Sequence, residues 1–582
     1  MVLYYFMNNI IGIVQARMSS TRLANKMTME ICGKTLLEHV ILRLMKSKKI
    51  SNIIVATSTR KTDDIIECIS KKVGVSVYRG SEENVLQRFK EANDIFKGNI
   101  IVRICADSPL IDPKIIDQAI INFFEIKPDY LTTTIKRTFP KGLDVEVFSK
   151  EALNKVYELA TEKYDLEHVT SYIMKHQELF NCYNLEATGE FNHPGIKLTV
   201  DTQKDFLFVK FIFESLYSKD KLFNIKDILN LLKNRSRIIF RVDGGNQLGM
   251  GDIFSMLNLA AELSDFEMLF ISKYEEGINK IKEIGYDVKM IPEGISLEGE
   301  IEIIKKINEN FCGDMIIIEL FKKDYQEYYR KLSSITKTLV VDLFGGIEVY
   351  SDILLNWNLL SDNIHYIEKN ENTIYCLDPG YTLLRKEIGK YHDLNKSIGD
   401  LVKNVLITVG GADPRNLTPK IINALKNFND IKFNIVLGSA FRNKDEVFGV
   451  LIDSDLNYSL IKDLNDISSL IYCADLVICA GGLTSFEVSA IGTPFIGISN
   501  IEWEADRLKR MEDKGICKYL GNWKDFDEKK LHNLFKDLVN NKMMRENMSI
   551  NGKKLLDGKG SSRVANIIRG VIKNGNKTNN EY

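Results

Sequence analysis

A short apolar run that leads into a basic, polar loop is the feature that most constrains this chain. Residues 11–15 read IGIVQ, which is typical of a buried strand, and residues 16–26 continue as ARMSSTRLANK. The loop gathers basic and hydroxyl side chains, namely Arg17, Ser19, Ser20, Thr21, Arg22 and Lys26. Such donors at the carboxyl end of a first strand suit a triphosphate, because parallel sheets bind ligands at that edge. From spacing alone, a solvated basic turn explains the loop equally well.

This stretch resembles the R-x-x-S-x-R-L-P-G-K signature of the nucleotidyltransferases that activate acidic sugars with CTP, in particular the spore-coat-polysaccharide type of acylneuraminate cytidylyltransferase. Ala24 and Asn25 stand where that family has Pro and Gly. Asn tolerates a left-handed backbone better than most residues, so the loop is able to keep its shape. The resemblance implies a GT-A-like, Rossmann-like domain that binds CTP through four side chains, Arg17, Ser19, Arg22 and Lys26. Of these, Arg17 and Lys26 are also the expected catalytic residues.

The length of 582 residues is too great for one hydrophobic core and indicates three or four domains. The chain has 78 basic and 79 acidic residues, and this balance argues against nucleic acid or a membrane surface as a partner. Nine cysteines without a C-x-x-C pair indicate reduced thiols in a cytosolic protein. No run approaches the roughly 20 apolar residues of a membrane span. Residues 1–15 lack a basic n-region and are expected to be a short leader plus the first strand.

From residue 10 to about 220, short β-rich runs alternate with amphipathic runs, which predicts an α/β domain with a mostly parallel sheet. We expect strands at 53–56, 76–78 and 100–104 and helices at 62–72 and 82–92. The strand at 100–104 runs into CADSPL, which places Asp107 at the ligand-binding edge of the sheet.

A second strand end, KLTVDT at 197–202, carries Asp201, for which a helix N-cap is the simpler explanation. In the resembled family, the matching D-x-P-L and V-D-T-x-x-D-L aspartates bind magnesium. The resemblance therefore implies that Asp107 and Asp201 are Mg²⁺ ligands. Two carboxylates plus phosphate oxygens suit this ion, which usually keeps several waters.

The segment PKGLDVEVF at 140–148 alternates polar and apolar residues, which predicts a strand with Asp144 and Glu146 on one face. An exposed edge strand with charges that oppose aggregation explains the pattern too. In the resembled family this segment lines the sugar side of the cleft, which implies that Asp144 and Glu146 bind a nonulosonate-like acidic sugar. A Lys- and Asn-rich stretch at 219–236 predicts that the first domain ends at residue 235.

Three glycine-rich loops, each after a β-rich run, organise the second half: RVDGGNQLGMGD at 241–252, VGGADP at 409–414 and AGGLTSFE at 480–487. They predict two Rossmann-like lobes, residues 236–390 and 391–582. The last loop brings Gly481 and Gly482 to a helix start, where free N–H groups favour a diphosphate. Thr484 and Glu487 also match a capping box that needs no ligand.

With GYTLLR at 380–385, these loops resemble the UDP-sugar hydrolase of pseudaminic acid biosynthesis, a two-lobed relative of the nucleotide-sugar glycosyltransferases, over about residues 237–520. The resemblance implies a GT-B-like lobe pair that binds a UDP-sugar through Gly410, Gly411, Gly481, Gly482, Thr484 and Glu487. The family's loop reads G-x-G-H-x-x-R, and here Asp252 and Ser255 replace its His and Arg.

Asp252 is therefore either the catalytic residue of the second half or a plain N-cap. At an ordinary carboxyl pKa near ~3.9 it is a weak base unless burial raises that value, so we expect UDP-sugar binding with poor hydrolysis. A glycosyltransferase and a non-catalytic UDP-sugar-binding module are the alternatives for this half. The sequence indicates no particular oligomeric state.

Overall fold

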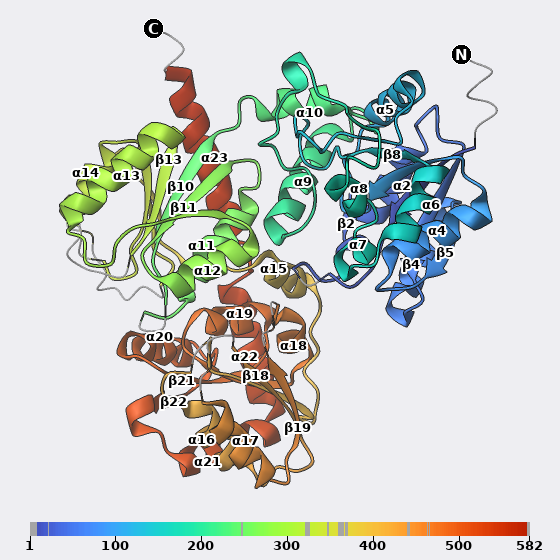
Figure 1. The fold of residues 1–582 in the computed structure, drawn as a ribbon. Helices are drawn as coiled ribbons and strands as arrows, with labels where there is room; N and C mark the ends of the chain where they lie inside the picture. Colours follow the sequence, from blue (N-terminus) through green and yellow to red (C-terminus); the bar gives the residue numbers. More distant parts are fainter. Residues whose placement is uncertain are drawn as a thin grey trace. The chain divides into compact units, whose positions relative to one another are not determined.

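The computed structural model of the chain describes residues 9–578 except 21, 246–247, 321–325, 346–347, 359–365, 367–369, 412, 439–440, 442, 463 and 465, and the backbone alone for 574–578 (Figure 1). The expected leader at 1–8, Thr21 of the basic loop and residues 246, 247 and 412 of the glycine loops lie outside the described residues. Two compact units are present: Met1–Arg235 with Glu283–Gly285, and Ser236–Lys282 with Tyr286–Tyr582.

The first unit is built on a seven-stranded sheet of order β5-β4-β1-β6-β8-β7-β9. Its strands are β1 (Ile10–Gln15), β4 (Asn52–Ser58), β5 (Ser76–Gly80), β6 (Ile100–Cys105), β7 (Tyr130–Thr132), β8 (Glu146–Ser149) and β9 (Cys182–Asn184). The four strands β5, β4, β1 and β6 are parallel, whereas β8 runs antiparallel to both of its neighbours. A small hairpin joins β2 (Glu30–Ile31) to β3 (Lys34–Thr35).

The helices of the first unit are α2 (Leu36–Leu44), α3 (Asp64–Val73), α4 (Val85–Phe96), α5 (Pro113–Ile126), α6 (Lys150–Leu159), α7 (Lys163–Glu167), α8 (Ser171–Lys175), α9 (Gln203–Leu216) and α10 (Ile225–Leu232). Phe89 of α4 and Val156 of α6 pack on Ile11 and Ile13 of β1 in one buried cluster. Residues 10–14 are all buried, as expected of a strand in a sheet covered on both faces.

The expected strands at 53–56, 76–78 and 100–104 lie within β4, β5 and β6, and the expected helices at 62–72 and 82–92 largely coincide with α3 and α4. The strand expected at 140–148 is shorter, because β8 begins only at Glu146. Before it, Gly142 turns the chain with a φ of 105°, and a Cβ there would lie 2.8 Å from the backbone carbon of Leu198. Asp144 therefore does not share a strand face with Glu146, which corrects the sequence prediction.

The second unit contains two parallel sheets, of order β12-β11-β10-β13-β14-β15-β16 and β19-β18-β17-β20-β21-β22. In each, the chain starts at a central strand, winds to one edge, returns and winds to the other, which is the doubly wound Rossmann order. Two such lobes in succession make this unit GT-B-like, in agreement with the sequence prediction.

The first lobe holds β10 (Arg237–Val242), β11 (Glu267–Ser272), β12 (Asp287–Met290), β13 (Met315–Glu319), β14 (Lys337–Val341), β15 (Ile353–Leu355) and β16 (Ile374–Cys376). Its helices are α11 (Gly251–Glu262), α12 (Glu275–Ile284), α13 (Leu297–Phe311) and α14 (Gln326–Ser333). The strands of the second lobe are β17 (Asn404–Thr408), β18 (Lys432–Leu437), β19 (Asn457–Lys462), β20 (Leu476–Ala480), β21 (Phe495–Ser499) and β22 (Lys518–Asn522).

The helices of the second lobe are α15 (Lys386–Asp393), α16 (Leu417–Leu425), α17 (Lys444–Ile452), α18 (Ser468–Cys473), α19 (Leu483–Ile491), α20 (Glu502–Asp513), α21 (Glu528–Asn540) and α22 (Lys542–Leu555). The last helix, α23 (Gly560–Thr578), returns to the first lobe, where Arg569 pairs with Asp265 at 2.7 Å. Among the described helices, none is both long and apolar enough to cross a membrane.

Candidate functional site

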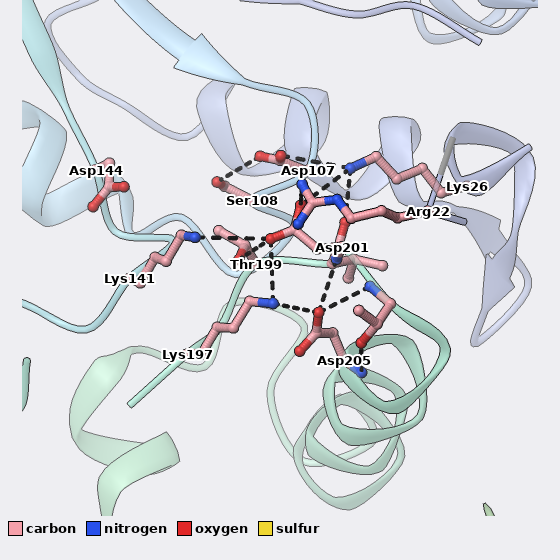
Figure 2. Close-up of polar contacts among 12 residues, drawn as sticks. Arg22, Lys26, Asp107, Ser108, Lys141, Asp144, Lys197, Thr199, Asp201 and Asp205 are labelled. Atoms are coloured by element: carbon pink, nitrogen blue, oxygen red, sulfur yellow. Dashed lines mark hydrogen bonds and ion pairs between the residues drawn. The ribbon is translucent and has the colours of Figure 1, made fainter. Parts of the chain in front are cut away.

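The carboxyl edge of the first sheet brings the basic loop and both candidate metal ligands together (Figure 2). Strands β1 and β6 are parallel neighbours with Gln15 opposite Cys105, so the loop after β1 and Asp107 after β6 emerge at the same edge. Asp201 reaches this edge because the N–H of Val200 donates to the carbonyl of Asp107 at 2.8 Å. Three segments far apart in sequence thus form one polar cluster.

Lys26 lies at the centre of this cluster. Its Nζ donates to the carbonyl of Val200 at 2.8 Å and lies 3.5 Å from Asp107 Oδ2 and 3.7 Å from Asp201 Oδ1. Asn25, directly before it, has φ 56° and ψ 21°, the left-handed conformation that the sequence allows there. One ammonium therefore ties together two carboxylates, one just after β6 and one from a distant segment. The segment before Asp201 forms an isolated β-bridge at Lys197 and not the expected strand.

The two oxygens of Asp201 face different groups of cations. Arg22 Nη2 lies 3.2 Å from Oδ1, on the same oxygen as Lys26. On the other side, Lys197 Nζ lies 3.2 Å and Lys141 Nζ 3.8 Å from Oδ2. Burial alone would raise the pKa of Asp201, but Lys197, Lys26 and Arg22 hold it below its ordinary value. Asp201 is therefore a carboxylate at neutral pH.

The N-cap explanation for Asp201 is wrong, because Thr202 caps α9. The Thr202 hydroxyl accepts the N–H of Asp205, and the Asp205 carboxylate accepts the N–H of Thr202, which completes a capping box. The carboxylate of Asp201 is thus available to the polar cluster. The nearby Asp205 also accepts the N–H of Asp201 at 3.1 Å and so fixes the backbone that carries it.

Arg17 and Ser19 lie on the same loop but in other surroundings. Arg17 Nη2 pairs with Glu167 Oε1 of α7 at 3.1 Å, and both side chains are more than one-third exposed. Ser19 is exposed. Of the four loop residues expected at CTP, the structure therefore joins Arg22 and Lys26 to the aspartates and places Arg17 and Ser19 at the solvent side of the loop.

The two expected sugar ligands differ in access. Glu146 is buried and is hydrogen-bonded by Tyr130 at 2.6 Å and Thr170 at 2.5 Å, besides its ion pair with Arg103. Burial opposes ionisation, but Arg103 and the two hydroxyls hold the pKa of Glu146 below its ordinary value. Asp144 is more open and binds Arg137 through both oxygens, at 2.6 and 3.2 Å. Asp144 is thus the more accessible of the two.

The donor set at this edge suits a divalent ion. Magnesium typically takes one or two protein carboxylates and completes its shell with water and phosphate oxygens. Asp107 and Asp201 offer two carboxylates that one cation already approaches within 4 Å. Among the described residues, no group of three or more His, Cys, Asp and Glu side chains could form an all-protein metal site.

In the second unit, Asp252 lies in the first turn of α11, one residue after its start, and Met250 is the N-cap residue. The plain N-cap explanation for Asp252 is therefore wrong. Burial, helped by the nearby carboxylate of Asp243, raises the pKa of Asp252 to about 7. Glu319 at the end of β13 is buried beside it, and the pKa of Glu319 is also raised because of burial and Asp252.

Two further contacts organise the surroundings of Asp252. The hydroxyl of Ser255 donates to Glu319 and lies 2.9 Å from the carbonyl of Asp252, so Ser255 joins the two acidic positions. Asp243 is held by a buried ion pair with Arg241 at 2.7 Å and by the N–H of Lys273 at 2.9 Å. The sequence singled out neither Glu319 nor this ion pair, because only the tertiary fold brings β13 next to α11.

The glycine loops of the second lobe follow strand ends as expected. Gly410, with a φ of 95°, and Gly411 follow β17, and Gly481 and Gly482 connect β20 to α19. The capping-box explanation for Thr484 and Glu487 is wrong, because Gly482 is the N-cap residue and caps α19 through no side chain.

The carboxylate of Glu487 instead accepts a hydrogen bond from Arg385 Nε at 2.7 Å. Arg385 precedes α15, so this contact ties the segment between the lobes to α19. Glu504 of α20 is a neighbour of the glycine pair, since its Oε1 lies 3.4 Å from where a Cβ on Gly482 would be. Thr484 is half-buried.

Two known protein families match separate parts of the chain. The family described as "Cytidylyltransferase" matches residues 11–241, and "Protein of unknown function (DUF354)" matches residues 405–515. The "Uncharacterized protein MJ1063" of Methanocaldococcus jannaschii is 43% identical over 197 residues, 34% of this chain and 80% of that protein.

Two proteins of Bacillus subtilis are also similar. The "Spore coat polysaccharide biosynthesis protein SpsF" is 37% identical over 213 residues, which cover 36% of this chain and 88% of SpsF. The "Spore coat polysaccharide biosynthesis protein SpsG" is 26% identical over 334 residues, which cover 56% of this chain and 96% of SpsG.

A mostly parallel sheet with cations and two carboxylates at its carboxyl edge is the arrangement expected of a nucleotidyltransferase. The identity to MJ1063 and SpsF over most of their lengths shows that the chain belongs to the cytidylyltransferase family. It is accordingly a nucleotidyltransferase of nucleotide-sugar biosynthesis.

The raised pKa of Asp252 has a consequence for stability. Because the folded unit holds this proton more tightly than the unfolded chain, the stability that protonation contributes is present below about pH 4 and is lost as the pH rises through about 7. Asp252→Asn removes the ionisation, so at pH 8 we expect the variant to be more stable by on the order of 1–3 kcal/mol, with little difference near pH 4.

Thermal unfolding of the full chain at pH 4 and pH 8, followed by circular dichroism, measures this difference. Asp445→Asn, at an exposed aspartate in the first turn of α17, is the matched control and should behave alike at both pH values. An Asp252→Asn midpoint at pH 8 equal to or below that of the unmodified chain would contradict a raised pKa at this position.

Proposed function

We propose that the first unit transfers CMP from CTP to a nonulosonate-like acidic sugar, with release of pyrophosphate. The observation that carries this proposal is the contact of Lys26 with both Asp107 and Asp201 at the carboxyl edge of β1 and β6. Residues 1–235 would form this catalytic domain, and residues 236–390 and 391–582 the two lobes of a UDP-sugar module.

The basic loop would hold the triphosphate. Arg22 and Lys26 would contact phosphate oxygens from their positions beside Asp201, and Arg17 and Ser19 would contribute from the open side of the loop. Arg22 and Lys26 would then stabilise the negative charge that develops as the bond from the α-phosphorus to pyrophosphate breaks. Positioning and charge neutralisation are the main contributions that a protein makes to phosphoryl-type transfer.

Asp107 and Asp201 would hold Mg²⁺, which neutralises phosphate charge when it is bound. The lowered pKa of Asp201 supports this role, because a metal ligand must be deprotonated at working pH. Asp144, half-exposed and paired with Arg137, would contact hydroxyl groups of the sugar. Glu146 is buried in the sheet and would act indirectly, because it fixes the positions of Arg103 and Tyr130.

To test the metal ligands, we would replace each aspartate by asparagine. Asp107→Asn and Asp201→Asn should each lower Mg²⁺-dependent pyrophosphate release from CTP by at least ~100-fold, because each removes a fixed charge at the transferring phosphate. A coupled pyrophosphate assay measures the rate, and circular dichroism verifies folding. Asp94→Asn on α4, where Asp94 pairs with Lys90 one turn earlier, should keep normal turnover. Near-normal activity of either site variant would remove that residue from the metal site.

For the second unit, we propose that the lobes bind a UDP-sugar and that Asp252 is the proton-transfer group. The glycine pairs at 410–411 and 481–482, with Thr484 and Glu487, would contact the UDP. An ordinary aspartate is a weak base, but a pKa of about 7 lets Asp252 both take and return a proton near neutrality. This observation favours catalysis over simple binding.

UDP release from UDP-N-acetylglucosamine and from a UDP-2,4-diacetamido sugar, with and without an acceptor, tests this proposal. We expect release that falls by 10²- to 10⁴-fold in Asp252→Asn, the usual contribution of a positioned acid or base. Release of UDP without an acceptor would indicate a hydrolase. Release of UDP only in the presence of an acceptor would indicate a glycosyltransferase. Binding of UDP without turnover in the unmodified chain would contradict the role of Asp252.

A further inference from the structure

Lys141 and Lys197 form a second pair of cations at Asp201, which we call the lysine pair. The two residues lie opposite each other in a parallel β-bridge outside the main sheet. The N–H of Lys141 donates to Ile196 at 2.9 Å, and the N–H of Leu198 donates to Lys141 at 2.7 Å. Since the two residues are paired in register on adjacent segments, both side chains are able to extend to the same carboxylate.

The tight turn at Gly142 keeps this pairing in place. Its φ of 105° lies in the region that glycine alone adopts readily, and the backbone of Leu198 occupies the space of a side chain. The bridge therefore depends on a close backbone approach and not on the lysine side chains themselves. Replacing a lysine should remove its charge while leaving the bridge intact.

The charges around Asp201 are divided between its two oxygens. Arg22 and Lys26, both from the basic loop, face Oδ1, whereas the lysine pair faces Oδ2. Figure 2 shows Lys141 and Lys197 approaching from one side and Lys26 from the other. These four cations face three carboxylates of the cluster, Asp107, Asp201 and Asp205. The cluster thus has an excess positive charge before any metal ion or substrate is bound.

The lysine pair is accessible to a ligand. The side chain of Lys141 is 47% exposed and that of Lys197 is 36% exposed, compared with 12% for Lys26. Neither lysine belongs to the loop that serves the triphosphate. Lys141 lies in the segment before β8, which also carries Asp144, and Lys197 lies opposite Lys141 in the β-bridge. An anion that is not part of the nucleotide would therefore meet these two ammonium groups.

The chemistry of a 2-keto sugar acid matches this arrangement. In its cyclic form, the carboxylate and the attacking hydroxyl are attached to the same carbon atom. When that hydroxyl attacks the α-phosphorus, the carboxylate must lie within a few ångströms of the phosphate and its metal ligands. Both ammonium groups already lie near carboxylates, Lys197 Nζ at 2.5 Å from Asp205 and 3.2 Å from Asp201, and Lys141 Nζ at 3.8 Å from Asp201. A sugar carboxylate would add charge-assisted hydrogen bonds to them that a neutral sugar cannot form.

We propose that the lysine pair binds the carboxylate of the sugar acid and so selects sugars that carry it on the carbon that bears the attacking hydroxyl. This inference rests on the proposed function of the first unit. Asp201 then separates two anion sites, one for the triphosphate and one for the sugar carboxylate. Lys141 and Lys197 are substrate-binding residues that determine specificity, and their loss should raise the KM for the sugar more than it lowers kcat.

Steady-state kinetics of the full chain tests this assignment, with CTP and either 3-deoxy-manno-octulosonate or N-acetylneuraminate as substrates. Lys141→Met and Lys197→Met should each raise the KM for the sugar acid at least tenfold and leave the KM for CTP within twofold. Lys197→Arg, which keeps the charge, should restore most of the affinity. Lys136→Met, at an exposed lysine paired with Glu186, should change neither KM.

The carboxyl methyl ester of the same sugar supplies the second arm. The unmodified chain should use the ester poorly, and Lys141→Met should discriminate less between acid and ester. An unchanged sugar KM in both lysine variants, or a raised KM for CTP or pyrophosphate, would overturn the inference while leaving CMP transfer to an acidic sugar intact. Turnover of neutral sugars or sugar phosphates but of no sugar acid by the unmodified chain would overturn the proposed function and the inference together.

Discussion

The contact of one ammonium group with two carboxylates organises the first unit. Lys26 lies within 4 Å of both Asp107 and Asp201, and these aspartates come from segments almost 100 residues apart. The contact exists because β1 and β6 are parallel neighbours and because the backbone of Val200 binds that of Asp107. Paired opposite charges can be buried at this edge, whereas an unpaired charge of either sign would raise the free energy of the folded state there. In the proposed reaction, the same charges would meet phosphate, metal ion and sugar.

Asp201 and Asp252 show how the surroundings decide the chemistry of one residue type. Cations surround Asp201 and lower its pKa, so it remains charged and suits a metal ion. Asp252 is half-buried near Asp243 and Glu319, and its pKa rises to about 7, which suits proton transfer. Under the proposed function, Asp252 would therefore serve as an acid or base in place of the histidine of the resembled family, because its surroundings raise a pKa that is too low in water.

The sequence predicted the α/β class and two Rossmann-like lobes, because strand periodicity and glycine loops are local signals, and the resemblance to a known family implied that the lobes are GT-B-like. It also placed Asp107 just after a strand, which is correct, but the strand expected before Asp201 is only an isolated β-bridge at Lys197. The N-cap assignments for Asp201 and Asp252 and the capping box at Thr484 and Glu487 were wrong, since Thr202, Met250 and Gly482 hold those positions. The lysine pair, Glu319 and the pKa of Asp252 depend on contacts between distant segments, and no local pattern encodes them.

The fate of the sugar oxygen tests the central claim most directly. The unmodified chain would be incubated with CTP, Mg²⁺ and a 2-keto sugar acid that carries ¹⁸O at the anomeric hydroxyl, and the products would be analysed by mass spectrometry and ³¹P NMR. We expect a CMP-sugar with the label in the bridge between carbon and phosphorus, together with an equal amount of unlabelled pyrophosphate. A product without the bridging label, or a CDP-sugar formed only from a sugar phosphate, would contradict attack by the hydroxyl of an acidic sugar on the α-phosphorus of CTP.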